Sequence, residues 1–167
     1  MCLASGAKGS RAEKGAASVR VVLQRVTSAS VSVEGQVVAS IERGLLALVG
    51  FRTEDGLADL KWMAGKLPEL RLFEDEAGKM NLSVADIGGA LLLVPNFTLY
   101  GDGRKGRRPS FTRARAFGEA EAVFEEFVEL VKARHPATQA GVFGAHMHVQ
   151  LLNDGPVTLL LDSEGQF

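Results

Sequence analysis

The chain has 167 residues, of which 46% are hydrophobic and 23% charged; this composition is typical of one folded domain and excludes a disordered or fibrous protein. The formal net charge of −1 excludes a general attraction to nucleic acid, so any such affinity must come from a local cluster of basic residues. One cysteine, three histidines and the lack of an apolar run of about 20 residues argue against a disulfide, a zinc site and a membrane span, and they predict a soluble cytoplasmic protein.

The N-terminal segment differs in composition from the rest of the chain. Residues 1–18 are rich in Ala, Gly, Ser and Lys, so we expect a disordered tail there and a single domain over residues 19–167. Over residues 19–27 apolar side chains alternate with polar ones, which predicts a half-buried strand at the start of that domain.

Two further strand signals follow. The β-branched runs 30–34 and 37–41 flank a short turn at Gly35 and predict a hairpin. The run 45–51 is continuously apolar, which predicts a strand buried on both faces. Each face of the sheet must therefore be covered.

Two segments predict helices. Apolar residues recur at helical spacing over 57–67, after the capping-type residues Thr53 and Asp55 and before Pro68, which we expect to end the helix. Residues 117–131 carry one apolar stripe surrounded by glutamates, which predicts an amphipathic helix whose stripe packs against the core.

The remaining elements are strands joined by turns. A polar turn is expected at 75–79, and the buried strand 90–94 ends at Pro95. Two final strands, 146–152 and 157–162, are expected on either side of a turn. Strands joined by short turns, together with two long helices, predict an α+β protein with a mixed sheet covered by helices.

The end of the strand before Pro95 is the best candidate site. Asn96 can donate a hydrogen bond to a developing oxyanion, and Thr98 offers a hydroxyl and a neighbouring backbone N–H to orient water or a carbonyl. On local grounds alone, a structural interpretation remains open in which Asn96 caps a turn and Thr98 fills a strand.

Basic residues gather in a glycine-containing loop with no acidic residue to offset them, which could meet phosphates or form ordinary solvated surface. They are Arg104, Lys105, Arg107, Arg108, Arg113 and Arg115. The three histidines show no pairing with a nucleophile and are expected at the surface or on an edge strand; they are His135, His146 and His148. A hydrolase with this sequence must therefore work without an ordinary triad or a metal.

Six segments in order resemble the D-aminoacyl-tRNA deacylase family, and the similarity spans residues 19–162. They are Leu23-Gln24-Arg25-Val26, Glu76-Ala77-Gly78-Lys79-Met80-Asn81, Phe97-Thr98-Leu99, Arg108-Pro109-Ser110-Phe111, Gly141-Val142-Phe143-Gly144-Ala145-His146-Met147 and Asn153-Asp154-Gly155-Pro156-Val157-Thr158. The resemblance implies a homodimer of three-layer β/β/α subunits with two active sites at the dimer interface and no metal or organic cofactor. The implied reaction is hydrolysis of the ester that joins a D-amino acid, or glycine, to the 3′ end of tRNA.

The resemblance also implies roles for individual residues. Gly155 and Pro156 match a motif with a cis bond that enters the site of the other subunit and leaves no room for an L side chain, and Arg25 helps to hold its carbonyls. The segment that receives the terminal adenosine is matched by Gly141, Phe143, Ala145 and Met147. The catalytic segment is Asn96, Phe97 and Thr98, with backbone N–H groups polarising the carbonyl, and the tRNA phosphates are expected to meet Arg104, Lys105, Arg107 and Arg108.

One segment departs from the family pattern. Pro95-Asn96-Phe97-Thr98 stands where the family has Ser-Gln-x-Thr, so a hydroxyl is lost and the amide is one methylene shorter. Proline at the first position is similar to a sister group that has a trans Gly–Pro bond and removes L-alanine from the wrong tRNA. A noncatalytic tRNA-binding module is a further alternative. Residues 153–158 match the D-specific family, which favours the D-specific reading, although the sequence alone does not decide whether Gly155–Pro156 is cis.

Overall fold

The computed structural model describes residues 18–165, and all but the last residue of the tail predicted over residues 1–18 lie outside them. Ser18, the last residue of that predicted tail, is buried, and its hydroxyl donates to a carboxylate oxygen of Asp162 at 2.7 Å. Ser18 therefore belongs to the folded part. Among the described residues, no helix is long and apolar enough to cross a membrane.

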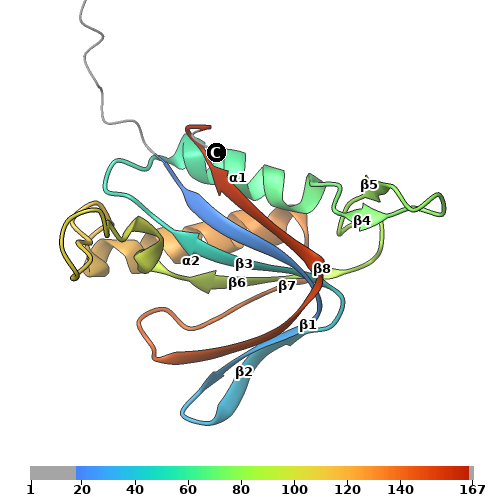
Figure 1. Cartoon of the computed structure of the whole chain (residues 1–167), viewed down its shortest axis with the longest axis horizontal. Helices are drawn as coiled ribbons and strands as arrows, with labels where there is room; N and C mark the ends of the chain where they lie inside the picture. Colours follow the sequence, from blue (N-terminus) through green and yellow to red (C-terminus); the bar gives the residue numbers. More distant parts are fainter. Residues whose placement is uncertain (1–17, 166–167) are drawn as a thin grey trace, which may run out of the picture.

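A mixed sheet forms the centre of the structure (Figure 1). Its strands are β1 (Arg20–Val33), β2 (Gln36–Ile41), β3 (Gly44–Gly50), β6 (Ala90–Pro95), β7 (Thr138–Ala140) and β8 (Met147–Asp162). The strand order is β2–β1–β3–β6–β7, and β8 pairs with β1 outside this path. β6 is parallel to β3 and β7, whereas β1 is antiparallel to β2, β3 and β8. The predicted α+β class with a mixed sheet is confirmed.

β1 and β8 are each one long strand, so the prediction of two strands in each region was wrong. β1 pairs with β3 over its first half and with β2 over its second, as the predicted hairpin requires. β8 follows β1 through both halves, and the register shifts on either side of Val26, opposite residues 153–157. Asn, Asp, Gly and Pro favour a turn locally, but here they form a bulge because pairing with β1 continues beyond them.

The central strands, β3 and β6, are buried on both faces. Leu45 and Val49 of β3 belong to the main core, which includes most of the buried residues of both helices. Leu46 of β3 and Leu92 of β6 belong to a second core, together with Ile41 of β2 and other residues of β1 and β2. The prediction that residues 45–51 are buried on both faces is therefore confirmed.

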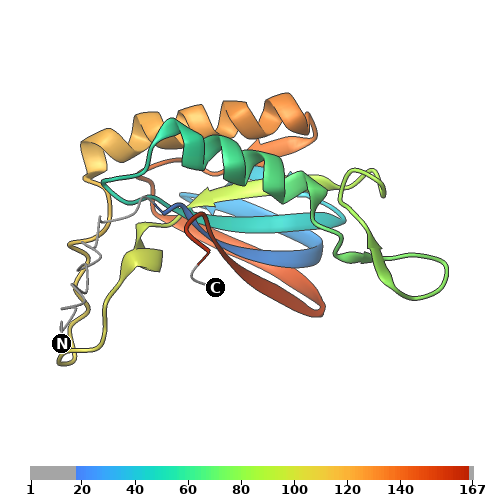
Figure 2. The same cartoon turned by 90° about the horizontal axis from the view of Figure 1, so that it is seen from above.

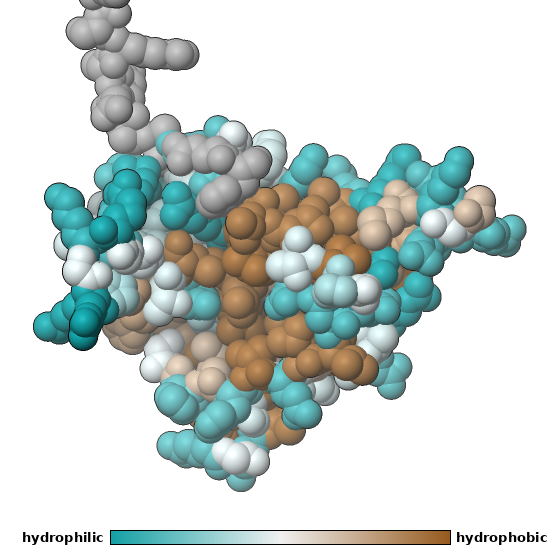
Figure 3. Space-filling model, in the orientation of Figure 1, coloured by the Kyte–Doolittle hydropathy of each residue, from teal (hydrophilic) through white to brown (hydrophobic). Residues whose placement is uncertain are grey.

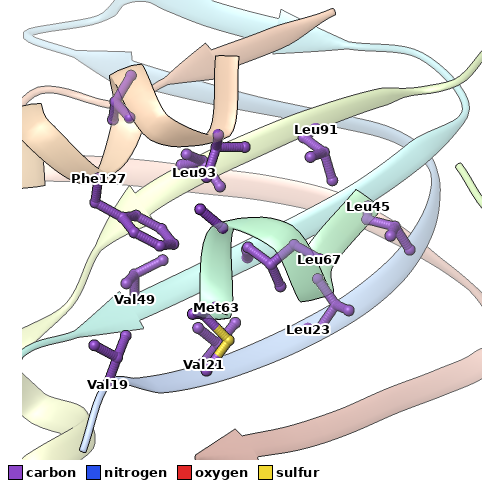
Figure 4. Packing of buried hydrophobic residues seen from close by; sticks show 14 of the residues in the cluster. Val19, Val21, Leu23, Leu45, Val49, Met63, Leu67, Leu91, Leu93 and Phe127 are labelled. Atoms are coloured by element: carbon purple, nitrogen blue, oxygen red, sulfur yellow. The ribbon is translucent and has the colours of Figure 1, made fainter. Parts of the chain in front are cut away.

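Two long helices, α1 (Leu57–Glu69) and α2 (Phe117–Arg134), lie on one face of the sheet (Figure 2). Met63 and Leu67 of α1 and Phe127 of α2 point toward the strands and are fully buried (Figure 4). The ring of Phe127 also meets Phe51 at a centroid distance of 5.8 Å. Both predicted helices are confirmed. They cover the face of the sheet opposite the second core, to which β1 and β2 contribute.

The ends of α1 differ from the prediction. α1 begins after Gly56, whose N–H donates to the Asp59 carboxylate at 3.1 Å. Asp55 does not cap the helix, because its carboxylate accepts the backbone N–H groups of Ser18 and of Arg52. Pro68 lies inside the last turn, and α1 ends one residue after it.

A two-stranded hairpin projects from one end of the sheet (Figure 1). It consists of β4 (Phe73–Glu74) and β5 (Met80–Leu82). The Asp75 N–H donates to the Lys79 carbonyl at 2.8 Å, which confirms the turn predicted over 75–79.

Candidate functional site

The segment that follows β6 forms a capped turn. β6 ends at Pro95, and the chain enters a short 3-10 helix, η1 (Phe97–Tyr100). The side-chain oxygen of Asn96 accepts the backbone N–H of Thr98 at 3.2 Å and also the Thr98 hydroxyl. Asn96 thus caps a turn, as the structural interpretation held, whereas Thr98 lies in η1 and not in a strand.

This cap determines which donors can meet a substrate. The Thr98 N–H is occupied by Asn96, so it is not available to polarise a carbonyl in this conformation. Within residues 18–165, neither the N–H of Phe97 nor the side-chain nitrogen of Asn96 has a hydrogen-bond acceptor. Two adjacent N–H donors at the end of a strand are suited to an oxygen on which negative charge develops.

A pocket with a volume of about 480 Å³ opens beside these donors. Its lining residues are Val49, Phe51, Pro95, Asn96, Phe97, Phe111, Ala114, Arg115, Ala116, Phe117, Ala120, Phe143, Gly144, Ala145 and Met147. The pocket thus unites the predicted catalytic segment with most of the predicted adenosine segment, although the two lie far apart in the sequence. Thr98 and Gly141 do not line it.

Gly141 leaves room for a side chain that lines the pocket, that of Met147. A Cβ atom at Gly141 would lie 2.8 Å from the sulfur of Met147, which does line the pocket. The Gly141 N–H donates to the Leu93 carbonyl at 2.8 Å, which ties this segment to β6. Gly141 therefore leaves space for Met147 and does not itself line this pocket.

Aromatic rings form much of the pocket wall. The rings of Phe97 and Phe111 meet edge to face at a centroid distance of 5.2 Å, and those of Phe117 and Phe143 lie 5.1 Å apart. Phe117 was predicted to pack in the core, but its side chain is 66% exposed. Its helical spacing placed it on the apolar stripe of α2, yet it lies in the first turn of the helix, beyond the edge of the sheet core.

Arg25 holds the chain just before Gly155–Pro156. Its Nε donates to the carbonyl oxygen of Asp154 at 3.0 Å, and its Nη1 donates to the carbonyl of Leu72 at 2.7 Å. Gly155 has a φ of +134°, and the Gly155–Pro156 bond is cis. Gly155 and Pro156 are exposed and do not line the pocket of their own chain.

The basic loop is less purely positive than predicted. Asp102 forms an ion pair of 2.5 Å with Arg104, and this pairing holds the pKa of the Asp102 carboxyl well below its usual range. The expectation that no acidic residue offsets the loop was therefore wrong. Lys105, Arg107 and Arg108 are exposed and have no acceptor among residues 18–165.

The histidines divide into two groups. His135 is buried, and its Nε2 lies 2.9 Å from the Gly89 carbonyl oxygen, so its predicted surface position was wrong. His146 and His148 are exposed, with ring centroids 5.1 Å apart. Within the described part of the chain, no three side chains of His, Cys, Asp or Glu gather as a metal site.

The fold and the pocket define an α+β protein with a mainly apolar pocket and with N–H donors, at the end of a buried strand, that have no acceptor in the described part of the chain. More particularly, the chain belongs to the D-Tyr-tRNA(Tyr) deacylase family, whose sequence pattern matches residues 22–162. The family inferred from six short segments is thereby confirmed.

Several known proteins are similar over most of their length. A D-aminoacyl-tRNA deacylase of Thermotoga petrophila is 53% identical over 149 residues, which cover 89% of this chain and all of that protein. A protein of the same name from Clostridium botulinum is 52% identical with the same coverage. The solved structure of a c-Myc DNA unwinding element binding protein is 41% identical, with a TM-score of 0.80 over 85% of this chain and 97% of the other. A probable eukaryotic D-amino acid tRNA deacylase, at 19% identity, shares the fold with a TM-score of 0.77 over 87% and 99% of the two chains.

Proposed function

We propose that this protein hydrolyses the ester between a D-amino acid, or glycine, and the 3′ end of tRNA in the cytoplasm. One observation beyond family membership carries this proposal: a single pocket joins the donors at Asn96 and Phe97 to the apolar wall of Phe143, Ala145 and Met147. An aromatic ring and a thioether suit the face of a purine. The terminal adenosine would then lie against this wall, with its ester at the end of β6.

In the proposed reaction, the N–H of Phe97 and the side-chain nitrogen of Asn96 stabilise the oxyanion that forms when the ester carbonyl is attacked. Water, oriented by protein groups or by the 2′-hydroxyl of the ribose, is the nucleophile. The bond from the carbonyl carbon to the ribose oxygen then breaks, and the free amino acid and the tRNA hydroxyl are released. Thr98 orients Asn96 through its hydroxyl and lacks a neighbouring base that would make it a nucleophile.

Selection of the D-enantiomer would require a second subunit. Gly155 and Pro156 are held away from the pocket of their own chain, and their backbone would close the pocket of a partner. Among the described strands, β8, which carries them, pairs only with β1, and it exposes Leu152 and Leu160, at 62% and 53%. A continuous apolar area lies on the face that carries β8 (Figure 3). We therefore propose a homodimer of three-layer β/β/α subunits, because such an area favours association.

The acceptor stem of tRNA would follow the basic loop. The cations of Lys105, Arg107 and Arg108, which have no acceptor within residues 18–165, could meet phosphates directly, whereas Arg104 must exchange its bond to Asp102. Such contacts make affinity fall as the salt concentration rises.

Deacylation assays test the proposal. The protein at excess should release D-tyrosine from D-tyrosyl-tRNA and glycine from glycyl-tRNA, and it should leave L-tyrosyl-tRNA intact. Binding without turnover would instead indicate the noncatalytic module. Loss of a mischarged L-alanyl ester would indicate the L-specific alternative.

A further inference from the structure

Arg115 is the only charged residue among those of the described chain that line the pocket. Its backbone N–H donates to the Phe51 carbonyl at 2.9 Å, which places it at the base of the basic loop. Its Nη2 donates to the carbonyl oxygens of Thr53 at 2.8 Å and of Asp55 at 3.3 Å. The guanidinium is therefore held in place by the turn before α1.

The other donors of this guanidinium lack an acceptor. Nε of Arg115 is buried without a hydrogen-bond partner, and Nη1 has none among residues 18–165. Asp55 is the carboxylate beside Arg115, and it already accepts the N–H groups of Ser18 and Arg52. A cation whose N–H groups are unsatisfied in apolar surroundings attracts an anionic oxygen strongly.

The neighbouring elements favour an anion at the same place. α2 begins two residues after Arg115, and its N-cap residue, Ala116, supplies no side-chain cap. The free N–H groups of that helix end add to the positive potential of the guanidinium. The acidic residue of this first turn, Glu119, is exposed and does not line the pocket.

We propose that Arg115 binds the phosphate that joins the terminal adenosine to the preceding nucleotide. The inference rests on the proposed function and extends it. The pocket would recognise a nucleotide rather than a nucleoside, because it would bind the phosphate next to the terminal adenosine as well as the adenosine itself. The same loop also carries Lys105, Arg107 and Arg108, and the phosphates of the preceding nucleotides would pass these residues.

Binding measurements with small ligands test this assignment. Adenosine, 5′-AMP and the dinucleotide CpA, which has the natural phosphodiester, are titrated into the intact protein at low salt. A charge-assisted hydrogen bond corresponds to at least about a tenfold preference for 5′-AMP and CpA over adenosine. Arg115→Met should abolish this preference and leave adenosine binding unchanged, whereas Arg115→Lys should retain part of it. Arg134→Met, at the other end of α2, removes the same charge outside the pocket and should preserve the preference.

The ligands separate the possible failures. If wild-type protein binds none of the three, the pocket assigned under the proposed function is wrong. If it binds adenosine and 5′-AMP equally, only the role of Arg115 is wrong. Equal weakening of all ligands by Arg115→Met, with an unchanged melting temperature, would show contact with the base or ribose and overturn the phosphate assignment. If Arg115→Met does not fold, Arg115→Lys provides the test. Lysine is a point charge without the guanidinium geometry, so raised salt should screen it more readily and reduce the preference for 5′-AMP and CpA over adenosine. A preference that raised salt leaves unaltered in Arg115→Lys would overturn the phosphate assignment.

Discussion

At the end of β6, the proposed reaction depends on two N–H donors, which belong to Asn96 and Phe97. The side-chain oxygen of Asn96 is occupied by Thr98, and the side-chain nitrogen of Asn96 and the N–H of Phe97 have no acceptor among residues 18–165. Asparagine therefore keeps a side-chain N–H donor at this position, although its amide is one methylene shorter than that of glutamine.

Replacing Asn96 with alanine should lower kcat for D-tyrosyl-tRNA by about 10²–10³, the usual effect of losing one oxyanion donor. Thr98→Val removes only the hydroxyl that orients Asn96, and we expect a reduction of less than about tenfold. Single-turnover rates measure both effects. Complete loss of activity in Thr98→Val would contradict the orienting role and would call for a direct role of the Thr98 hydroxyl in the reaction.

Gly155 is a second residue whose local conformation leads to a prediction. Its φ of +134° disfavours a side chain, and a Cβ would lie 2.7 Å from Cγ2 of Val157 and 3.0 Å from its nitrogen. Gly155→Ala should therefore weaken deacylation and leave adenosine binding intact. Gly78→Ala is the matched control, since Gly78 has a φ of +73° with nothing within 4 Å. Unchanged turnover in Gly155→Ala would contradict the placement of this bulge at the active site.

At the scale of elements, apolar patterns predicted the sheet and helices well. Residues 45–51 and 90–94 are apolar at every position or nearly so because both faces of β3 and β6 are covered. The continuity of β1 and β8 could not be predicted in the same way, because a bulge within one strand and a turn between two strands favour the same local residues. Phe117 shows the same limit: helical spacing places it on the stripe, but only the end of the sheet decides whether anything covers it.

The buried Asp55 fastens the start of β1 to the turn before α1. Burial raises the pKa of its carboxyl to about 6. The folded protein then binds more protons than the unfolded chain between about pH 4 and pH 6, so the free energy of unfolding falls as pH rises through this window, by on the order of 2 kcal/mol. Urea denaturation at several pH values measures the slope, which should be shallower in Asp55→Asn. Equal slopes in both proteins would contradict this assignment.

For the whole molecule, the proposed homodimer implies that a complete site takes residues from two subunits. The pocket holds the proposed donors and the adenosine wall, whereas Gly155 and Pro156 lie elsewhere on the same chain. A sequence can indicate both parts through separate motifs, but periodicity does not reveal whether they meet between copies. The exposed side chains of Leu152 and Leu160 on β8 are surface that the proposed dimer would cover.

Mixed dimers test whether the two parts meet between subunits. Asn96→Ala and Gly155→Ala subunits, co-expressed with different tags and purified as mixed dimers, should regain about half of wild-type activity. Under two-fold symmetry one site then receives both substitutions and the other receives neither. A subunit with both substitutions, paired with a wild-type subunit, should behave in the opposite way, because each of its two sites contains one defect. If Gly155 served the pocket of its own chain, the first mixture would stay inactive and the second would keep half its activity, so the two mixtures together distinguish the arrangements even if one variant is only partly impaired.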